Sequence, residues 1–238
     1  MLRQPTHWHN TSYRVLNMLF DADNKDLPFN PFKALVAPRP IGWLTTISDA
    51  GVVNLAPYSY FQAVADNPDI VMFSAAPQME ITEKGMNFLD SGKDSQSNAA
   101  SGGEFVCNMV SMDLVNAMNE SSAHHPADIS EPELIGIEMT ESTHVKPPRV
   151  KQAPAAIECV VVDTYTVQHR GGNHRYTMTF GEVVGIHIKD EFIKDGRVDT
   201  AAMQLVTRMG YDEYAVLEKA FSLSRPDNDP LLSGFVKS

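Results

Sequence analysis

Hydrophobic and polar residues alternate in part over residues 37–61, which predicts two β-strands joined by a tight turn. Ile41, Trp43 and Ile47 fall on one face of the first strand, while Thr46 and Ser48 fall on the other. The connection Asp49-Ala50-Gly51 carries glycine where a positive φ is easiest, as in many hairpins. Pro57 cannot donate to a sheet ladder, so the second strand is expected to kink or stop pairing there.

Further strands are predicted along the rest of the chain. Residues 69–74 form a short apolar run that suits a strand buried on both faces, and residues 103–111 form another candidate. Residues 155–167 and 176–188 form a long pair, and the second of them alternates in the manner of a half-buried strand. A short strand and turn are expected at residues 192–196.

Three helices are predicted. Ser111 is placed to cap the first, which carries Leu114 and Met118 on one face. The second covers residues 199–209 and stops at Gly210, and the third covers residues 212–221. The pattern favours a mainly β protein, a closed barrel with peripheral α-helices. We expect an N-terminal arm over residues 1–30, one domain over residues 31–222 and a C-terminal tail over residues 223–238.

Composition restricts the possible partners. The 238 residues are 43% hydrophobic and 21% charged, as in soluble globular proteins, and no apolar run is long enough to span a bilayer. A net charge of −11 argues against nucleic acid or an anionic membrane as partner. An anionic small ligand would need local help from Lys, Arg, hydroxyls or backbone N–H groups. Cys107 and Cys159 are expected to be reduced and buried, and the N-terminus lacks a secretory signal, which favours a cytoplasmic protein.

Several catalytic classes lack their motifs. No G-x-G-x-x-G loop, Walker loop or G-x-S-x-G elbow occurs. His124 and His125 are adjacent and do not face one ligand together, and nothing near His7 and His9 completes a metal site, so no metal is expected.

Two polar features remain open to more than one interpretation. The segment around Lys93, Ser95 and Asn98 is either a solvated turn or a phosphate cradle. The kink at Pro57 either ends an ordinary hairpin or frees polar groups to hold a planar heterocycle.

The order of several motifs resembles the flavin reductase family, whose fold is the FMN-binding split β-barrel. Each motif is weak alone, but together they run in the family's order over residues 35–214. The matching segments are APRPIGW at 37–43, NLAPYSYF at 54–61, VMFS at 71–74, KDS with Asn98 at 93–98, GEFVCN at 103–108, AMN at 117–119, PPR at 147–149, EC at 158–159 and GEV at 181–183.

This resemblance implies FMN, held non-covalently near a homodimer interface, with NAD(P)H as a transient co-substrate that passes hydride to flavin N5. By position, the isoalloxazine and ribityl chain would be bordered by Thr45, Thr46, Asn54, Ala56, Pro57, Tyr58 and Ser59. The phosphate would be held by Ser74, Lys93, Ser95 and Asn98. In such chemistry the protein binds and orients, so no catalytic residue is assigned.

The chain departs from the family pattern at two places. Ser95 stands where threonine is usual, and residues 75–92 look like a longer loop than usual. The resemblance implies an NAD(P)H-dependent flavin reductase. An FMN-binding electron carrier or storage protein and a split-barrel oxidase of a small organic substrate stay open as alternatives. His187, Arg208 and Tyr211 lie in segments able to reach a flavin across a dimer, although an ordinary strand histidine and helix-end residues are the favoured interpretation.

Overall fold

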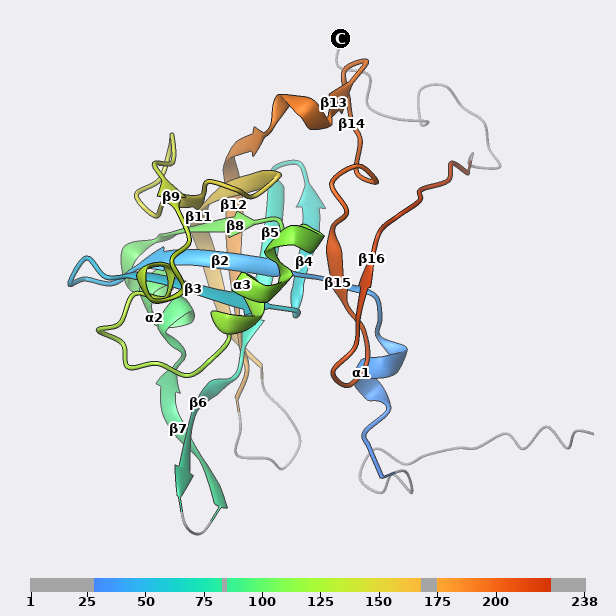
Figure 1. Ribbon diagram of the computed structural model, residues 1–238. Coiled ribbons are helices and arrows are strands. Elements are labelled where there is room, and N and C mark those ends of the chain that lie inside the picture. The colour runs from blue at the N-terminus through green and yellow to red at the C-terminus, as the bar shows by residue number, and fades with distance from the viewer. Residues whose placement is uncertain (1–27, 83–84, 168–174, 224–238) are drawn as a thin grey trace, which may run out of the picture.

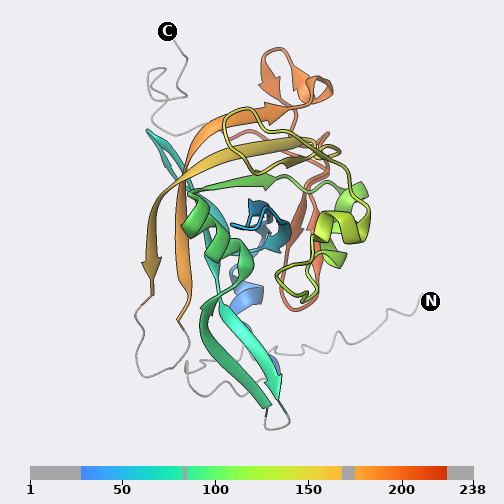
Figure 2. The ribbon, with the colours of Figure 1, turned by 90° about the vertical axis from the view of Figure 1, so that its left-hand side faces the viewer.

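The computed structural model describes residues 28–82, 85–167 and 175–223, and it is dominated by one curved antiparallel sheet (Figures 1 and 2). Seven strands lie in the order β3-β2-β8-β11-β12-β5-β4. Their bounds are β2 Gly42–Ile47, β3 Val53–Tyr58, β4 Phe61–Asp66, β5 Asp69–Ala75, β8 Glu104–Asn108, β11 Ala155–Thr166 and β12 Thr177–Ile188. Sequence analysis predicted strands in most of these regions, although β4 falls beyond the end of the predicted hairpin.

Smaller sheets and short helices surround this sheet. The other strands are β1 Arg39–Pro40, β6 Pro77–Thr82, β7 Gly85–Gly92, β9 Met139–Thr140, β10 Arg149–Val150, β13 Ile193–Lys194, β14 Arg197–Val198, β15 Val206–Arg208 and β16 Tyr214–Val216. The α-helices are α1 Phe32–Leu35, α2 Asp94–Gly102, α3 Val115–Glu120 and α4 Glu131–Ile135, and the 3-10 helices are η1 Met112–Leu114 and η2 Asp190–Phe192.

The hairpin of β2 and β3 forms as predicted, with Gly51 at a φ of 84° in its turn. The expected interruption at Pro57 is wrong, because Pro57 pairs with Trp43 and the ladder continues to Tyr58. Strand β3 lies at the edge of the sheet, and the N–H of Leu55, two residues earlier, faces away from β2 toward Glu131. Residues two apart on a strand direct their N–H groups to the same side, so the backbone nitrogen of Pro57 also faces away from β2. The N–H that proline lacks therefore removes no hydrogen bond between β2 and β3.

Strand β2 is buried on both faces, so the predicted two-sided alternation does not describe it. Leu44 packs in one cluster with Phe73 and Phe105, and Trp43 packs in a second with Leu55 and Val110. The helical and irregular segment after β8 covers the second face. Because both faces of β2 are covered, apolar residues occupy consecutive positions along it.

The C-terminal helices predicted over residues 199–209 and 212–221 are wrong. Residues 200–204 form turns, and β15 and β16 follow, with β15 paired to both β1 and β16. Gln204, inside the first range, has a φ of 47°, which an α-helix does not accommodate, and the second range contains strand β16. The spacing of apolar residues predicted a helix here, but Val206 begins strand β15 and is buried in the second cluster.

Two further segments differ from the sequence-based expectation. The longer loop over residues 75–92 contains the β6–β7 hairpin, which extends away from the main sheet in Figure 1. The polar segment after Lys93 is helix α2, which ends at Gly103 in the left-handed conformation. The helix predicted after Ser111 is confirmed as η1 and α3. The arm at 1–30 and the tail at 223–238 lie almost wholly outside the described residues, as do His7 and His9.

Candidate functional site

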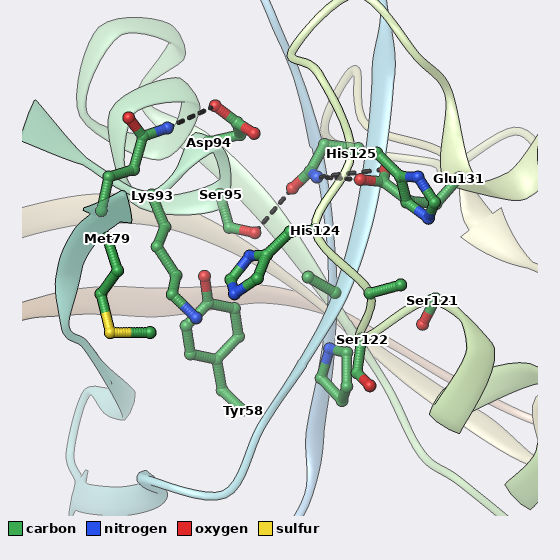
Figure 3. A pocket seen from close by; sticks show the side chains of 15 residues that line it. Tyr58, Met79, Lys93, Asp94, Ser95, Ser121, Ser122, His124, His125 and Glu131 are labelled. Carbon is green, nitrogen blue, oxygen red and sulfur yellow. Dashed lines mark hydrogen bonds between the residues drawn. The ribbon is translucent and has the colours of Figure 1, made fainter. Parts of the chain in front are cut away.

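A pocket of about 390 Å³ opens beside the edge strand β3, where the start of α2, the end of α3 and the start of α4 approach it (Figure 3). This volume lies within the usual range for small-molecule sites. The lining residues are Asn54, Ala56, Pro57, Tyr58, Gln78, Met79, Lys93, Asp94, Ser95, Ser121, Ser122, Ala123, His124, His125 and Glu131.

Six residues that the sequence proposed for the site line this pocket together. They are Asn54, Ala56, Pro57, Tyr58, Lys93 and Ser95. They come from β3 and from the start of α2, which lie far apart in the sequence. The fold therefore brings the NLAPYS strand and the KDS segment to one place.

The other five proposed residues lie elsewhere. Ser59 and Ser74 line a separate, mainly apolar hollow of about 1040 Å³, and Asn98 lines a third hollow near the β2–β3 turn. Thr45 is fully buried and accepts a hydrogen bond from Asn108 Nδ2 at 2.8 Å. Thr46 stands behind the pocket, hydrogen-bonded to Asn54 and Asn98.

A buried polar network supports the β3 wall of the pocket. Asn54 Nδ2 lies 3.1 Å from both carboxylate oxygens of Glu131, and the Leu55 N–H donates to Glu131 Oε2 at 3.0 Å. Ser95 Oγ lies 2.6 Å from Asn54 Oδ1. These bonds connect β3, α2 and α4, so they fix the relative positions of three elements that line the pocket.

Lys93 supplies positive charge to the pocket. Figure 3 shows its side chain running beside the Tyr58 ring, with His124 pointing into the same space. Among the residues whose side chains the structure describes, which exclude 80–91, its ammonium has no hydrogen-bond or ion-pair partner. Burial lowers the pKa of Lys93, because the charged form loses solvation without a compensating anion. An unpaired, partly buried ammonium indicates an anionic ligand.

The first turn of α2 adds backbone donors beside Lys93. The N–H groups of Gln96 and Ser97 are taken by the Lys93 carbonyl. The N–H groups of Asp94 and Ser95 precede these bonds, where a helix leaves its amides without intrahelical partners. Because the positive end of the helix dipole lies here, the position favours a negatively charged group.

The two acidic side chains of the pocket are both engaged. Glu131 accepts the N–H groups of Asn54 and Leu55, and Asp94 accepts Gln78 Nε2 at 3.4 Å. Burial raises the pKa of Asp94, which favours its neutral form. Both side chains therefore accept hydrogen bonds from groups other than the Lys93 ammonium.

Sequence reasoning missed the wall formed by residues 121–125 and Glu131. Ser121 is anchored by the indole N–H of Trp43 at 2.8 Å, and this bond fixes where the segment leaves α3. His124 and His125 were considered only as metal ligands. Ser130-Glu131-Pro132 was a detectable helix start, since an acidic residue and a proline are favoured in a first turn.

His187, Arg208 and Tyr211 do not line the pocket within one chain. His187 pairs with Ala156 in the ladder of β11 and β12, and its pKa is lowered by burial and by nearby Arg149. Arg208 lies over the Tyr214 ring, 4.5 Å from its centroid, and donates to the Tyr211 carbonyl.

Metal binding and membrane insertion are two further possibilities. Over residues 28–82, 85–167 and 175–223, no group of three or more His, Cys, Asp or Glu side chains is arranged to hold a metal ion. Among the helices of the same residues, none has the length and apolar character required to cross a membrane.

Comparison with known proteins agrees with the fold and with the motif order. Residues 35–202 match the model of the flavin reductase like domain. An uncharacterised protein of Deinococcus radiodurans is 35% identical over 200 residues, which cover 81% of this chain and 82% of that protein.

Two solved structures show the same architecture. Nitrilotriacetate monooxygenase component B from Bacillus cereus superposes with a TM-score of 0.72 at 30% identity, covering 84% of this chain and all of that one. A Shewanella frigidimarina protein with a split-barrel domain superposes with a TM-score of 0.70 at 20% identity, covering 88% and 100%. The predicted split-barrel fold is thus confirmed, and the chain belongs to the flavin reductase like family.

Proposed function

We propose that this protein is an FMN-dependent oxidoreductase, an NAD(P)H:flavin reductase that works as a homodimer. Family membership supports flavin chemistry in general. The observation that carries the choice of a phosphate-bearing flavin is the Lys93 ammonium, which enters the pocket beside the first amides of α2 and has no partner among the side chains that the structure describes.

The residues present fit FMN. A flavin mononucleotide needs an apolar bed for its ring and donors for its phosphate. Ala56 and Pro57 give one wall a flat apolar surface, and Lys93 with the start of α2 gives positive charge and N–H groups. The hydroxyl of Ser122 and the imidazole of His124 also line the pocket and offer polar contacts.

When bound, the flavin supplies the redox chemistry by accepting hydride from nicotinamide at N5. The chain's own residues bind and orient. Tyr58 is not expected to act as a base, because burial raises its pKa to about 12 and keeps the phenol protonated. In this proposal Lys93 binds the phosphate through its charge and transfers no proton. The sequence likewise shows no motif of a nucleophilic catalyst.

Exposed apolar side chains support the homodimer. Val162, Tyr165, Val184 and Ile186 are 38–60% exposed on the adjacent strands β11 and β12. Apolar side chains gathered on neighbouring strands are typical of a protein–protein contact. Light scattering coupled to gel filtration tests this part, and a monomer at micromolar concentration contradicts it.

A cytoplasmic location belongs to the same proposal, because Cys107 and Cys159 are both free.

The decisive experiment is the visible spectrum and FMN fluorescence of the purified protein, followed by NAD(P)H oxidation with free FMN or FAD. A colourless protein that leaves FMN fluorescence unchanged refutes the cofactor. FMN binding with negligible NAD(P)H oxidation would instead identify an electron carrier or storage protein. Oxygen consumption that depends on a small organic substrate, without nicotinamide, would identify an oxidase.

A further inference from the structure

Several hydrogen bonds behind the β3 wall meet at one side-chain amide, that of Asn54. Both carboxylate oxygens of Glu131 lie 3.1 Å from Asn54 Nδ2, and Oε2 also accepts the Leu55 N–H. A carboxylate can only accept hydrogen bonds. The amide must therefore turn its nitrogen toward Glu131 and its oxygen toward α2, which settles an orientation that atom positions alone leave ambiguous.

This orientation fixes the direction of the bonds on the other side of Asn54. Because Oδ1 can only accept, Ser95 Oγ donates its one hydrogen to it, at 2.6 Å. A second arm has the same direction, since Asn98 Nδ2 donates to Thr46 at 3.2 Å and Thr46 donates to Asn54 Oδ1 at 3.3 Å.

We propose that Glu131 is a positioning residue that sets the direction of this network, so that Ser95 offers only acceptor lone pairs to a bound ligand. The inference deepens the proposed function and rests on it for the identity of the ligand. Ser95 then receives a hydrogen from a ring N–H or a hydroxyl of the ligand. The phosphate, which has no hydrogen to give when fully ionised, is left to Lys93 and the first amides of α2. Ser95 is thus separated from the phosphate role that the family resemblance implied.

The first test compares FMN with riboflavin, which lacks only the phosphate, on the Ser95→Ala variant. An acceptor facing the ring or the ribityl chain contributes equally to both ligands. We expect both dissociation constants to rise by the same factor, about threefold to tenfold for one hydrogen bond. A loss confined to FMN shows that Ser95 donates to the phosphate and overturns the proposal. Unchanged affinity for both ligands overturns it as well.

The second test reverses the network. In Glu131→Gln, the Leu55 N–H holds the new amide oxygen, so the new NH2 group faces Asn54. Asn54 must then flip or leave two donors in contact, and its nitrogen turns toward Ser95 and Thr46. We expect FMN affinity to fall about tenfold and the melting temperature of the flavin-free protein to fall by about 3 °C or more.

The double variant Asn54→Asp/Glu131→Gln restores the original direction. The carboxylate now lies at position 54, where it accepts from Ser95, from Thr46 and from the amide introduced at position 131, while the net charge of the pair is unchanged. We expect FMN affinity to return to within about threefold of wild type, and the melting temperature to recover. Glu133→Gln, an exposed change on the same helix, is the matched control and should leave both unchanged.

Recovery of the melting temperature in the double variant is expected of a merely structural role as well, because the same hydrogen bonds are restored; the result that only the positioning role predicts is the equal loss of FMN and riboflavin affinity in Ser95→Ala. A double variant as weak or as unstable as Glu131→Gln overturns the proposal, and so does a Glu131→Gln variant equal to wild type. The melting temperatures are measured without flavin, so they test the direction of the network even if wild type binds no FMN. In that case the proposed function fails separately.

Discussion

Replacing Lys93 by methionine is expected to remove most of the preference for a phosphate-bearing flavin. The substitution keeps much of the length of the side chain and removes its charge. No partner among the described residues loses an ion pair, because the ammonium has none. The effect should therefore appear in ligand binding rather than in the folded state.

The magnitude follows from the partial burial of Lys93. Two unit charges about 4 Å apart attract by about 1 kcal/mol in water and about 4 kcal/mol at an effective dielectric of about 20. Lys93 is half-buried in a pocket that opens to solvent, so an intermediate value of about 2 kcal/mol is appropriate. This corresponds to FMN binding about thirtyfold more weakly in Lys93→Met.

The assay is quenching of flavin fluorescence at about 0.05 M and about 0.5 M salt, since salt screens exposed charges far more than buried ones. Riboflavin should bind the variant and wild type alike, and the FMN defect should shrink at high salt. Lys151→Met is the control, because Lys151 is exposed and pairs with Glu138 outside the pocket. An equal loss for riboflavin, or a defect independent of salt, would refute the reasoning.

The same residue predicts a pH dependence of defined sign. The pKa of Lys93 is lowered in the folded protein, so its charge is lost at a lower pH than in the unfolded chain. Between the two pKa values the unfolded state holds one more proton, and stability rises with pH. FMN affinity should fall over the same interval, as the ammonium that binds the phosphate disappears. Lys93→Met should abolish both trends.

Three further tests concern the core behind the site. Gly181→Ala places a methyl group 2.4 Å from Phe105 Cζ and should destabilise the fold by about 1–3 kcal/mol in urea unfolding; an unchanged midpoint contradicts the packing. Burial raises the pKa of Cys107 well above its ordinary value and that of Cys159 to about 12, so neither thiol should react with a disulfide reagent at about pH 8 until the protein unfolds. Asn108→Ala breaks three buried hydrogen bonds and should cost about 3 kcal/mol, whereas a loss below about 1 kcal/mol would show that the network is replaceable.

The main strands could be predicted from the sequence because their signals are local. Alternation and apolar runs indicated most strands of the sheet, and Gly51 indicated the turn between β2 and β3. The C-terminal segment could not be predicted in this way. Its apolar spacing fits a helix, but pairing of β15 with β1, which lies near the other end of the described chain, determines its conformation.

Part of the candidate site could be predicted from the sequence, because some of its residues belong to local motifs. Asn54 and Tyr58 lie on a strand with a recognisable motif, and Lys93 and Ser95 follow it in a second motif. His124 comes from an irregular segment without periodicity, and Glu131 begins the short helix α4, whose start signal does not indicate that it faces β3. Their place at the pocket depends on long-range contacts, such as the bonds from Glu131 to β3, and these contacts leave no trace in residue spacing.

The arrangement of the acidic groups explains how a chain with a net charge of −11 can offer a site to an anion. Global charge acts over long distances and is screened, whereas an ion at a pocket wall responds to its nearest neighbours. Glu131 accepts the N–H groups of Asn54 and Leu55. Burial raises the pKa of Asp94 and so favours its neutral form. Neither carboxyl group forms an ion pair with the Lys93 ammonium, so this ammonium is available to an anionic ligand. The network that positions Asn54 and the absence of an ion pair between Glu131 and Lys93 are therefore two results of one arrangement, in which Glu131 binds amides instead of the ammonium.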